Sequence, residues 1–340
     1  MKKEKEYDFS KGERGKFYRE NLRLNLPLDQ LLEKFASGDR RALARLISLV
    51  ENNSNDSTEI LDKLHPRTGQ AYRIGITGPP GAGKSTLVDE LTKLYRQQGQ
   101  TVGIIAVDPT SPFTGGALLG DRVRMSDLSG DDGVFIRSMA TRGSLGGLSH
   151  RAQEVADVLD AFGKDIVMLE TVGVGQSELD IVEAVDTTIV VLVPESGDSV
   201  QAMKAGLMEI ADIFVLSKAD RGGADRAMLE IQAVLSLSEL SLSEAKEPER
   251  WNPPVIKTIA REGRGVADLL QAIIHHGEFL KKQGLFHQKR RQRLEKQVKK
   301  IIDQKLRERF WTLDRERLLK AQLDEVSSPQ KIVKKLFSDY

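Results

Sequence analysis

Cysteine is absent from the 340 residues of the sequence, which excludes both a disulfide framework and a thiolate-bound metal cluster. Long apolar runs are also absent, since no stretch reaches the about 18 residues that a membrane-spanning helix needs. The charged start, Met1–Glu6, is not followed by the apolar core of a signal peptide. We therefore expect a soluble, cytoplasmic protein that does not associate with a membrane.

Net charge is nearly missing as well, because 51 basic residues are balanced by 50 acidic ones. The resulting charge of +1 gives no global field that would draw the protein to nucleic acid or to anionic lipid. Apolar residues, in contrast, make up 39% of the chain and can form a sizeable core. The length corresponds to one large domain with additions or to two smaller domains.

Residues 1–65 have the pattern of a helical N-terminal extension. A helix is predicted over Gln30–Ala36, and Asp39 has the side chain of an N-cap for a second helix over Arg40–Glu51. The second helix carries an apolar stripe at helical spacing, which consists of Leu43, Leu46, Ile47 and Val50.

Residues 66–283 have the pattern of an α/β domain. Short β-rich runs alternate with segments of helix length, and many of these runs are apolar throughout. Strands that are buried on both faces of a parallel sheet have this composition. The predicted strands are Arg73–Thr77, Val102–Asp108, Val134–Arg137, Ile166–Glu170, Thr188–Val193, Ile213–Ser217 and Val255–Ile259. The predicted fold class is α/β, with a mostly parallel central sheet, flanking helices, and helical extensions at both ends.

Residues 284–340 form the predicted C-terminal extension. It contains a basic cluster, Gln288–Arg293, and a largely charged helix with one apolar face, formed by Leu294, Val298, Ile301, Ile302 and Leu306. Three interpretations are open: a solvated helix packed on its own domain, a dimerisation arm, or a basic surface for nucleic acid. The third is the weakest, because acidic residues interleave soon after the basic cluster.

A phosphate-binding loop follows the first predicted strand. It matches GxxxxGK[ST] at every fixed position and precedes a predicted helix over Thr86–Gln97. Its glycines let backbone N–H groups point at phosphate oxygens, and the helix N-terminus adds partial positive charge. We expect Lys84 to reach the β- and γ-phosphates and the hydroxyl of Ser85 to bind Mg²⁺. The predicted nucleotide-binding residues here are Gly78, Pro79, Pro80, Gly81, Ala82, Gly83, Lys84, Ser85 and Thr86.

Three carboxylates are candidates for the magnesium site, because Mg²⁺ prefers oxygen ligands. Asp108 and Glu170 each end a predicted strand, and Asp121 lies in a glycine-rich loop. Glu170 also opens a segment with the layout of the GTPase motif DxxG, with Glu in place of Asp. Gly173, the last residue of that segment, is expected to offer its N–H to the γ-phosphate.

Ser217-Lys218-Ala219-Asp220 stands at a strand end, where GTPases carry [NT]KxD. The carboxylate of Asp220 can accept two hydrogen bonds from guanine, whereas adenine would leave it unpaired. Sites of this kind can discriminate by about 10⁴–10⁵. We therefore expect GTP selectivity, with the stem of Lys218 stacked along the base. Ser217 replaces the usual Asn, whose amide ties this loop to the P-loop, so we also expect looser nucleotide affinity.

Thr258, Ile259 and Ala260 follow the last predicted strand. GTPases place a backbone N–H on the guanine oxygen at this point of the chain. The three residues are therefore expected to contact the base.

Several segments together resemble the MeaB/ArgK family, the methylmalonyl-CoA mutase-associated GTPases. They cover the core almost continuously, extend into the N-terminal helices, and are more specific than the P-loop alone. The segments are GDRRALARLISLVE (38–51), GITGPPGAGKSTLVDEL (75–91), VGIIAVDPTSPFTGGALLGDRVRM (102–125), VFIRSMATRGSLGGLS (134–149), ETVGVGQSELDI (170–181) and VPESGDSVQAMKAGLMEIADIFVLSKAD (193–220).

The resemblance implies a homodimeric GTPase whose P-loop strand and Mg²⁺-carboxylate strand are neighbours. It also implies that the protein serves an adenosylcobalamin-dependent acyl-CoA mutase, gating cofactor loading and protecting the mutase from inactivation. The C-terminal segment matches the family's dimerisation arm in place. By motif match, the magnesium and catalytic-carboxylate roles go to Ser85, Asp108, Asp121 and Glu170. Arg124, Asp198 and Lys204 match mobile-loop positions tied to partner-stimulated hydrolysis.

A residue that orients the attacking water is not evident, because Val174 follows Gly173 where Ras-like enzymes carry Gln. We therefore expect slow intrinsic hydrolysis, with Arg124 or Lys204 completing the site when a partner binds. The alternative function is an ArgK-like kinase or ATPase linked to amino-acid transport, which Asp220 disfavours. A metal-insertion GTPase is disfavoured by the lack of cysteine, and a non-catalytic GTP-binding scaffold is disfavoured by the intact P-loop.

Overall fold

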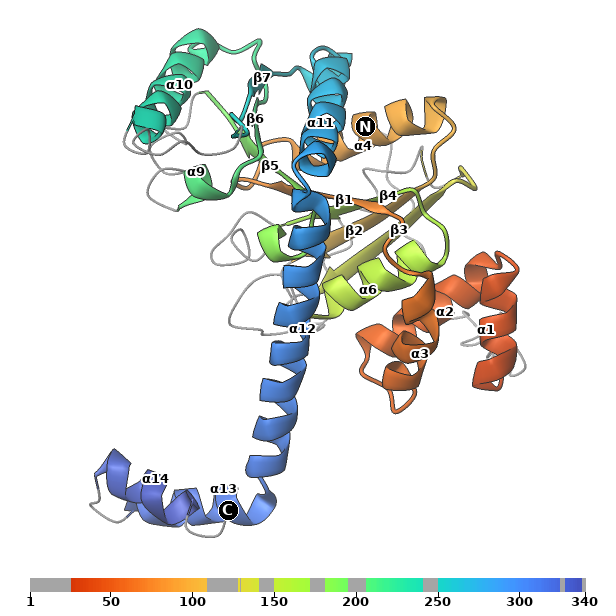
Figure 1. Ribbon diagram of the computed structural model, residues 1–340, viewed down its shortest axis with the longest axis vertical. Coiled ribbons are helices and arrows are strands. Elements are labelled where there is room, and N and C mark those ends of the chain that lie inside the picture. The colour runs from red at the N-terminus through yellow and green to blue at the C-terminus, as the bar shows by residue number, and fades with distance from the viewer. Residues whose placement is uncertain are drawn as a thin grey trace, which may run out of the picture.

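The structure is a computed structural model that describes residues 26–108, 128, 130–140, 150–171, 181–194, 206–240, 250–324 and 328–337. Figure 1 shows three parts: a central α/β core, a group of N-terminal helices beside it, and a long helix that leaves the core and ends in two short helices. No described helix is both long and apolar enough to cross a membrane.

Seven parallel strands form one sheet in the order β3-β2-β4-β1-β5-β6-β7. The strands are β1 Tyr72–Thr77, β2 Val102–Asp108, β3 Val134–Ala140, β4 Ile166–Glu170, β5 Thr187–Leu192, β6 Ile213–Leu216 and β7 Val255–Lys257. All seven predicted strands are confirmed, with ends that differ by up to three residues.

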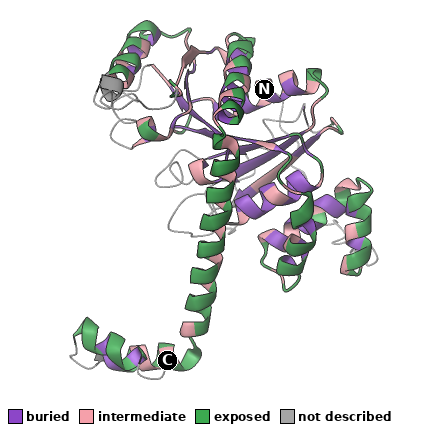
Figure 2. Ribbon diagram, in the orientation of Figure 1, coloured by how far each residue is buried: buried purple, intermediate pink, exposed green. Residues whose placement is uncertain are grey.

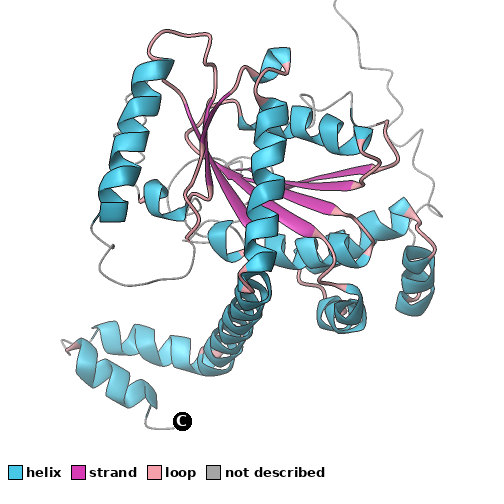
Figure 3. Cartoon of the chain, turned by 45° about the horizontal axis from the view of Figure 1, so that its top comes forward, coloured by secondary structure: helices cyan, strands magenta, loops and turns pink. Residues whose placement is uncertain are grey.

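Helices cover both faces of the sheet (Figure 3). The helices α4 (Lys84–Gln97) and α11 (Val266–Lys282) share one apolar core with Ile104 of β2. The next residue, Ile105, enters the opposite core, which α6 (His150–Ala161) covers. Successive side chains of a strand point to opposite faces, so the continuous apolar runs supply both cores. Beside β5 and β6, α9 (Leu207–Ile210) and α10 (Ala224–Leu240) enclose a third cluster.

The N-terminal helices are α1 (Leu28–Ala36), α2 (Arg40–Glu51) and α3 (Ser57–Leu64), followed by the 3₁₀ turn η2 (His65–Arg67). The side chain of Asp39 caps α2 by accepting from the N–H groups of Arg41 and Ala42 at 2.7 and 3.2 Å. The apolar stripe of α2 lies in the same core as α6. The extension is therefore packed onto the α/β core, and a domain boundary near residue 65 stays a prediction.

The C-terminal helices are α12 (Leu285–Phe310), α13 (Leu313–Asp324) and α14 (Pro329–Phe337). Helix α12 has no fully buried residue, and Figure 2 shows it exposed along most of its length. Four apolar residues that repeat every fourth position are about half exposed: Leu294 46%, Val298 47%, Ile302 50% and Leu306 49%. Leu294, Val298 and Ile301 also line a cleft that α12 forms with α3 and α6, so a solvated helix packed on its own domain and a dimerisation arm both stay open as interpretations.

The basic cluster at the start of α12 contacts acidic groups of the core. Asp186, which is 1% exposed, accepts from Arg290 at 3.2 Å and from Arg293 at 2.8 Å. Lys289 lies 3.6 Å from the carboxylate of Asp212. These cations form ion pairs within the chain. Their positive charge is therefore balanced by the core, which argues against the interpretation of a nucleic-acid surface.

Replacing Asp186 by Asn is expected to lower the free energy of unfolding by about 3–5 kcal/mol, because two arginines would lose their buried counter-ion. Burial raises the pKa of Asp186, but Arg293 and Arg290 outweigh burial and hold it below its ordinary value. The stabilisation that the ionised Asp186 gives to the folded state is therefore fully present above the unfolded pKa of about 3.9, and it is lost as pH falls through the lower folded pKa.

Urea unfolding at several pH values tests this expectation. The difference between the native sequence and Asp186→Asn should shrink below about pH 4. The control is Asp303→Asn, which removes an exposed carboxylate of α12. A difference between Asp186→Asn and the native sequence that equals that of the control would contradict the buried ion pair.

Candidate nucleotide site

The phosphate loop begins where β1 ends. Gly78 has φ 137°, and a Cβ at this position would clash with the backbone oxygen of Val191. Gly81 and Gly83 also have positive φ, at 75° and 91°. A residue with a side chain is disfavoured at such angles, so the glycine spacing of the motif follows from the backbone path. The loop then enters α4 at Lys84.

Lys84 is buried, and its Nζ donates to the carbonyl oxygens of Gly78 and Pro79 at 2.8 and 3.0 Å. The side chain therefore folds back over the loop and holds its ammonium group inside it. The N-terminus of α4 adds partial positive charge at the same place. The loop and the helix N-terminus together form a site suited to an anion such as a phosphate group.

Ser85 and Glu170 lie together at the carboxyl edge of the sheet. The Ser85 hydroxyl donates to Glu170 Oε1 at 2.7 Å. Ser85 lies in the first turn of α4, and Glu170 ends β4, which pairs with β1, the strand before the phosphate loop, with Ile76 opposite Glu170. The hydroxyl of Thr171 also donates to that of Thr77 at 2.8 Å. The neighbouring strands implied by the family resemblance are confirmed, and the Thr77–Thr171 bridge is a contact that the motif analysis missed.

Asp108 ends β2, which pairs with β4 on the side away from β1. The carboxyl ends of parallel strands lie at one edge of the sheet, so Asp108 stands at the same edge as Glu170. The side chain of Asp108 lies outside the described residues, as do Asp121, Arg124, Gly173, Asp198 and Lys204. Their roles stay predictions.

The loop after β6 is tied to the phosphate loop by two side chains. Ser217 is buried, and its hydroxyl donates to the carbonyl oxygen of Ala82. Lys218 adopts a left-handed conformation with φ 54°, and its Nζ donates to Gly81 at 2.7 Å. The expectation that Ser217 leaves this loop untied is therefore wrong, because its short hydroxyl makes the tie in place of an Asn amide. Asp220 is exposed at the end of the same loop.

Replacing Ser217 by Ala is expected to weaken GTP binding about 2- to 10-fold, because one buried hydrogen bond contributes about 0.5–1.5 kcal/mol. Calorimetric titration with GTP measures the effect. Ser236→Ala is the matched control, since it also removes a hydroxyl that donates to a backbone carbonyl, but from the exposed face of α10. Equal affinities in the two variants would show that the Ser217 tie does not matter for the nucleotide.

The segment after β7 offers fewer N–H groups than its sequence suggests. The N–H of Thr258 donates to Leu216 at 2.8 Å, and that of Ile259 donates to Arg264 at 3.0 Å. Ala260 opens the 3₁₀ helix η5 (Ala260–Glu262), where a first N–H has no acceptor within the helix. Of these three residues, Ala260 is therefore the one expected to offer its N–H to the guanine oxygen, and other contacts of Thr258 and Ile259 with the base stay predictions.

The segment after β7 is hydrogen-bonded to the loop that carries Asp220, and Gly265 packs closely against its backbone. Ala219 donates its N–H to the carbonyl oxygen of Thr258 at 3.1 Å. Gly265 has φ 75°, and a Cβ there would clash with the backbone oxygen of Lys257. The loops that carry Asp220 and Ala260 are thus held to each other, and the first of them is held to the phosphate loop.

The site therefore combines a phosphate loop, a hydroxyl–carboxylate pair and a loop with an exposed carboxylate, in the chain order of a GTPase. A family model described as "Methylmalonyl Co-A mutase-associated GTPase MeaB" matches residues 43–315. The chain belongs to the MeaB family. It is accordingly a GTPase with a P-loop α/β fold.

Relatives of this MeaB-family chain include GTPase ArgK of Escherichia coli, which is 38% identical over 283 residues, 82% of this chain and 85% of ArgK. A Pyrococcus horikoshii protein with the provisional name of a GTPase is 55% identical over 276 residues, 81% of this chain and 86% of its own length. A solved structure, an LAO/AO transport system kinase, is 29% identical with a TM-score of 0.66, covering 91% of this chain and 96% of that chain.

Proposed function

We propose that this GTPase binds Mg²⁺–GTP and uses its hydrolysis to gate adenosylcobalamin loading and to protect methylmalonyl-CoA mutase or a related acyl-CoA mutase. The observation that carries the nucleotide part is the connection of phosphate loop and base loop through Ser217 and Lys218. These two hydrogen bonds support a single site in which the phosphate loop holds the phosphates and the Asp220 loop holds the base. The mutase part is supported by the family to which residues 43–315 belong.

The residues at the carboxyl edge fit a hard divalent cation. The Ser85 hydroxyl and the Glu170 carboxylate form an all-oxygen donor pair, 2.7 Å apart, and Mg²⁺ prefers such ligands. Ser85 and Glu170 would hold Mg²⁺, with Asp108 and Asp121 as the further proposed carboxylates. When bound, the ion neutralises charge that develops on the β- and γ-oxygens during phosphoryl transfer.

The protein's own residues mainly position the phosphates and stabilise charge. Lys84 stands where its ammonium can move from the Gly78 and Pro79 carbonyls to phosphate oxygens. Gly173 is the proposed donor to the γ-phosphate. Arg124 or Lys204 is the proposed partner-dependent cation, and a cation of this kind contributes about 10³–10⁵ in rate when it enters a GTPase site. Intrinsic turnover is therefore slow and partner-stimulated turnover is faster.

At the base end, Asp220 accepts the two guanine N–H hydrogen bonds and Ala260 donates its N–H to the guanine oxygen. Lys218 lies between these groups and the phosphate loop, with its stem along the base. The rival function is an ATP-dependent kinase, and one observation favours it: the similar solved structure is named as a transport system kinase. This rival predicts that ATP binds as well as GTP.

We also propose a homodimer formed through the C-terminal helices α12, α13 and α14, which we call the arm. The exposed row Leu294, Val298, Ile302 and Leu306 supports this, because an apolar row along one helix face is typical of a helix that meets another chain. Exposed apolar residues continue onto α13 and α14, at Leu313, Leu323, Val333 and Phe337. Sedimentation of the purified protein tests the dimer, and a monomer at micromolar concentration would contradict it.

A pull-down from native extract tests the mutase proposal. The bait is loaded with a non-hydrolysable GTP analogue, and the captured proteins are analysed for cobalamin. We expect capture of a cobalamin-containing acyl-CoA mutase. Lys84→Ala is the control bait, because it lacks the ammonium group of the phosphate loop. Equal cobalamin with both baits, or none with either, would contradict the proposal.

A further inference from the structure

The short segment just before β5 lies directly against β1, the strand that precedes the phosphate loop. It begins with the 3₁₀ helix η4 (Ile181–Glu183) and ends at Asp186; we call residues 181–186 the wedge. A Cβ on Gly75 of β1 would lie 2.7 Å from Ile181 Cγ1 and 3.0 Å from Val185 Cγ2. Gly75 therefore makes room for the wedge only three residues before the phosphate loop begins at Gly78.

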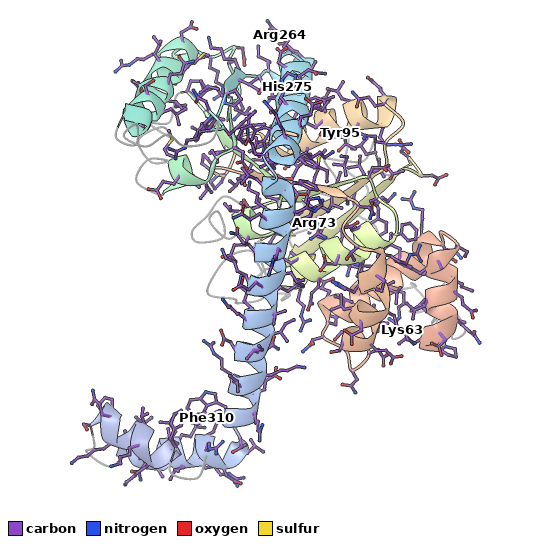
Figure 4. The ribbon with its side chains drawn as sticks, in the orientation of Figure 1. Lys63, Arg73, Tyr95, Arg264, His275 and Phe310 are labelled. Atoms are coloured by element: carbon purple, nitrogen blue, oxygen red, sulfur yellow. The ribbon has the colours of Figure 1, made fainter. Side chains whose placement is uncertain are left out.

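The wedge is also bonded to the backbone of β1. Arg73 donates its N–H to the Asp186 carboxylate at 2.9 Å, and Asp186 donates its N–H to the carbonyl oxygen of Arg73 at 2.8 Å. Figure 4 labels Arg73 where α12 passes beside the sheet. A shift of β1 on binding of the nucleotide phosphates is therefore passed directly to the wedge.

The other side of the wedge holds the arm. Glu183 pairs with Lys300 at 2.7 Å and with Lys296 at 3.1 Å, and Asp186 pairs with Arg290 and Arg293. Burial raises the pKa of Glu183, but the hydrogen bonds from Lys300 and Lys296 outweigh burial and hold it below its ordinary value. The four cations follow one face of α12 at intervals of three or four residues.

These two sets of ion pairs differ in exposure. Asp186 is buried with its arginines and fixes one point of α12. Glu183 lies between two lysines that are one helical turn apart and about half exposed, at 57% and 46%. The Glu183 carboxylate is held by both of these lysines. The wedge thus contacts α12 at a buried point, Asp186, and at a more exposed point, Glu183.

We propose that the wedge couples the phosphate loop to the direction of the α12 arm, so that GDP and GTP set different arm directions and the arm in turn sets the GTP/GDP preference. The coupling is reciprocal. If the arm direction changes the ratio of the GTP and GDP affinities, exchange of GDP for GTP changes the equilibrium between arm directions by the same factor. The inference rests on the proposed function in that the bound nucleotide is taken to be GTP or GDP. It goes beyond that function by naming the element that reports the nucleotide to the arm.

Two matched substitutions test the coupling. Glu183→Gln removes the ion pairs of the wedge with Lys296 and Lys300, whereas Glu295→Gln removes a carboxylate that pairs with Lys299 within α12. Lys300→Gln repeats the test from the arm side. Each variant is first checked by thermal unfolding against the native sequence, and the affinities for GDP and for a non-hydrolysable GTP analogue are then measured by calorimetry.

The arm direction is measured in the same variants by spin-label distances. Because the sequence has no cysteine, labels can be placed on Gln98→Cys at the end of α4 and Asp303→Cys on α12, both exposed positions. Labelled chains are diluted with unlabelled ones so that only distances within one chain contribute. The native sequence and Glu295→Gln should show a distance that differs between GDP and the GTP analogue.

In Glu183→Gln and Lys300→Gln, this nucleotide-dependent difference should be lost and the ratio of the GTP-analogue and GDP affinities should change about five-fold or more. Behaviour of both variants that matches Glu295→Gln in distance and in affinity ratio would overturn the coupling while leaving the proposed GTP binding intact. Failure of the native sequence to bind either nucleotide would instead overturn the proposed function, and this inference with it.

Discussion

Replacing Asp220 by Asn should change the preferred nucleotide from GTP to XTP, with the ratio of the two affinities altered by about 10⁴. The carboxylate accepts from the ring N–H and the exocyclic amine of guanine. An amide in its place still accepts from the ring N–H, but its NH₂ group meets the guanine amine with no acceptor. Xanthine has an oxygen there, which can accept from that amide.

Calorimetry with GTP and XTP measures this change. Asp225→Asn is the control, since it removes an exposed carboxylate nearby that pairs with Lys257 rather than with the base loop. GTP preference that survives in Asp220→Asn would show that Asp220 does not read the base. The assignment of the loop held by Ser217 and Lys218 would then be wrong.

Replacing Lys84 by Ala should lower GTP turnover by about 10²–10³, the effect of removing one preorganised group that stabilises transition-state charge. The side chain is buried in the phosphate loop and its ammonium lies 2.8 Å from the Gly78 carbonyl, so a nearby cation cannot easily replace it. Single-turnover hydrolysis at saturating GTP separates the loss in rate from any loss in affinity.

Lys93→Ala on the same helix α4 is the control for Lys84→Ala. Lys93 pairs with Asp89 and Glu90 at the surface of that helix, away from the phosphate loop. Its substitution should leave turnover unchanged. Native turnover in Lys84→Ala would contradict the role of the phosphate loop in hydrolysis.

The elements that the sequence predicts well are those with a local physical signature. Most of the seven strands are largely apolar because both of their faces are buried, and the spacing of Gly78, Gly81 and Gly83 reflects backbone angles that glycine adopts most easily. The Asp39 cap depends only on its own next three residues. In each case, the residues that decide the structure are neighbours in the chain.

The contacts that the sequence does not predict join segments far apart in the chain. Ser217 meets Ala82 across 135 positions, so its substitution for Asn looks like a loss until the hydroxyl is seen to reach the loop. The N–H of Thr258 donates to the carbonyl oxygen of Leu216, which depends on how β6 and β7 are paired. The basic cluster of α12 suggests an external anion, whereas its counter-ions are Asp186 and Asp212, which lie far earlier in the chain.

We expect one site to bind a triphosphate through Lys84 and to select guanine through Asp220. Calorimetric titration of the purified protein with GTP and with ATP, each with Mg²⁺, tests it most directly. We predict one GTP bound per chain and ATP binding weaker by about 10⁴. No heat of GTP binding, or equal affinities for GTP and ATP, would contradict the claim.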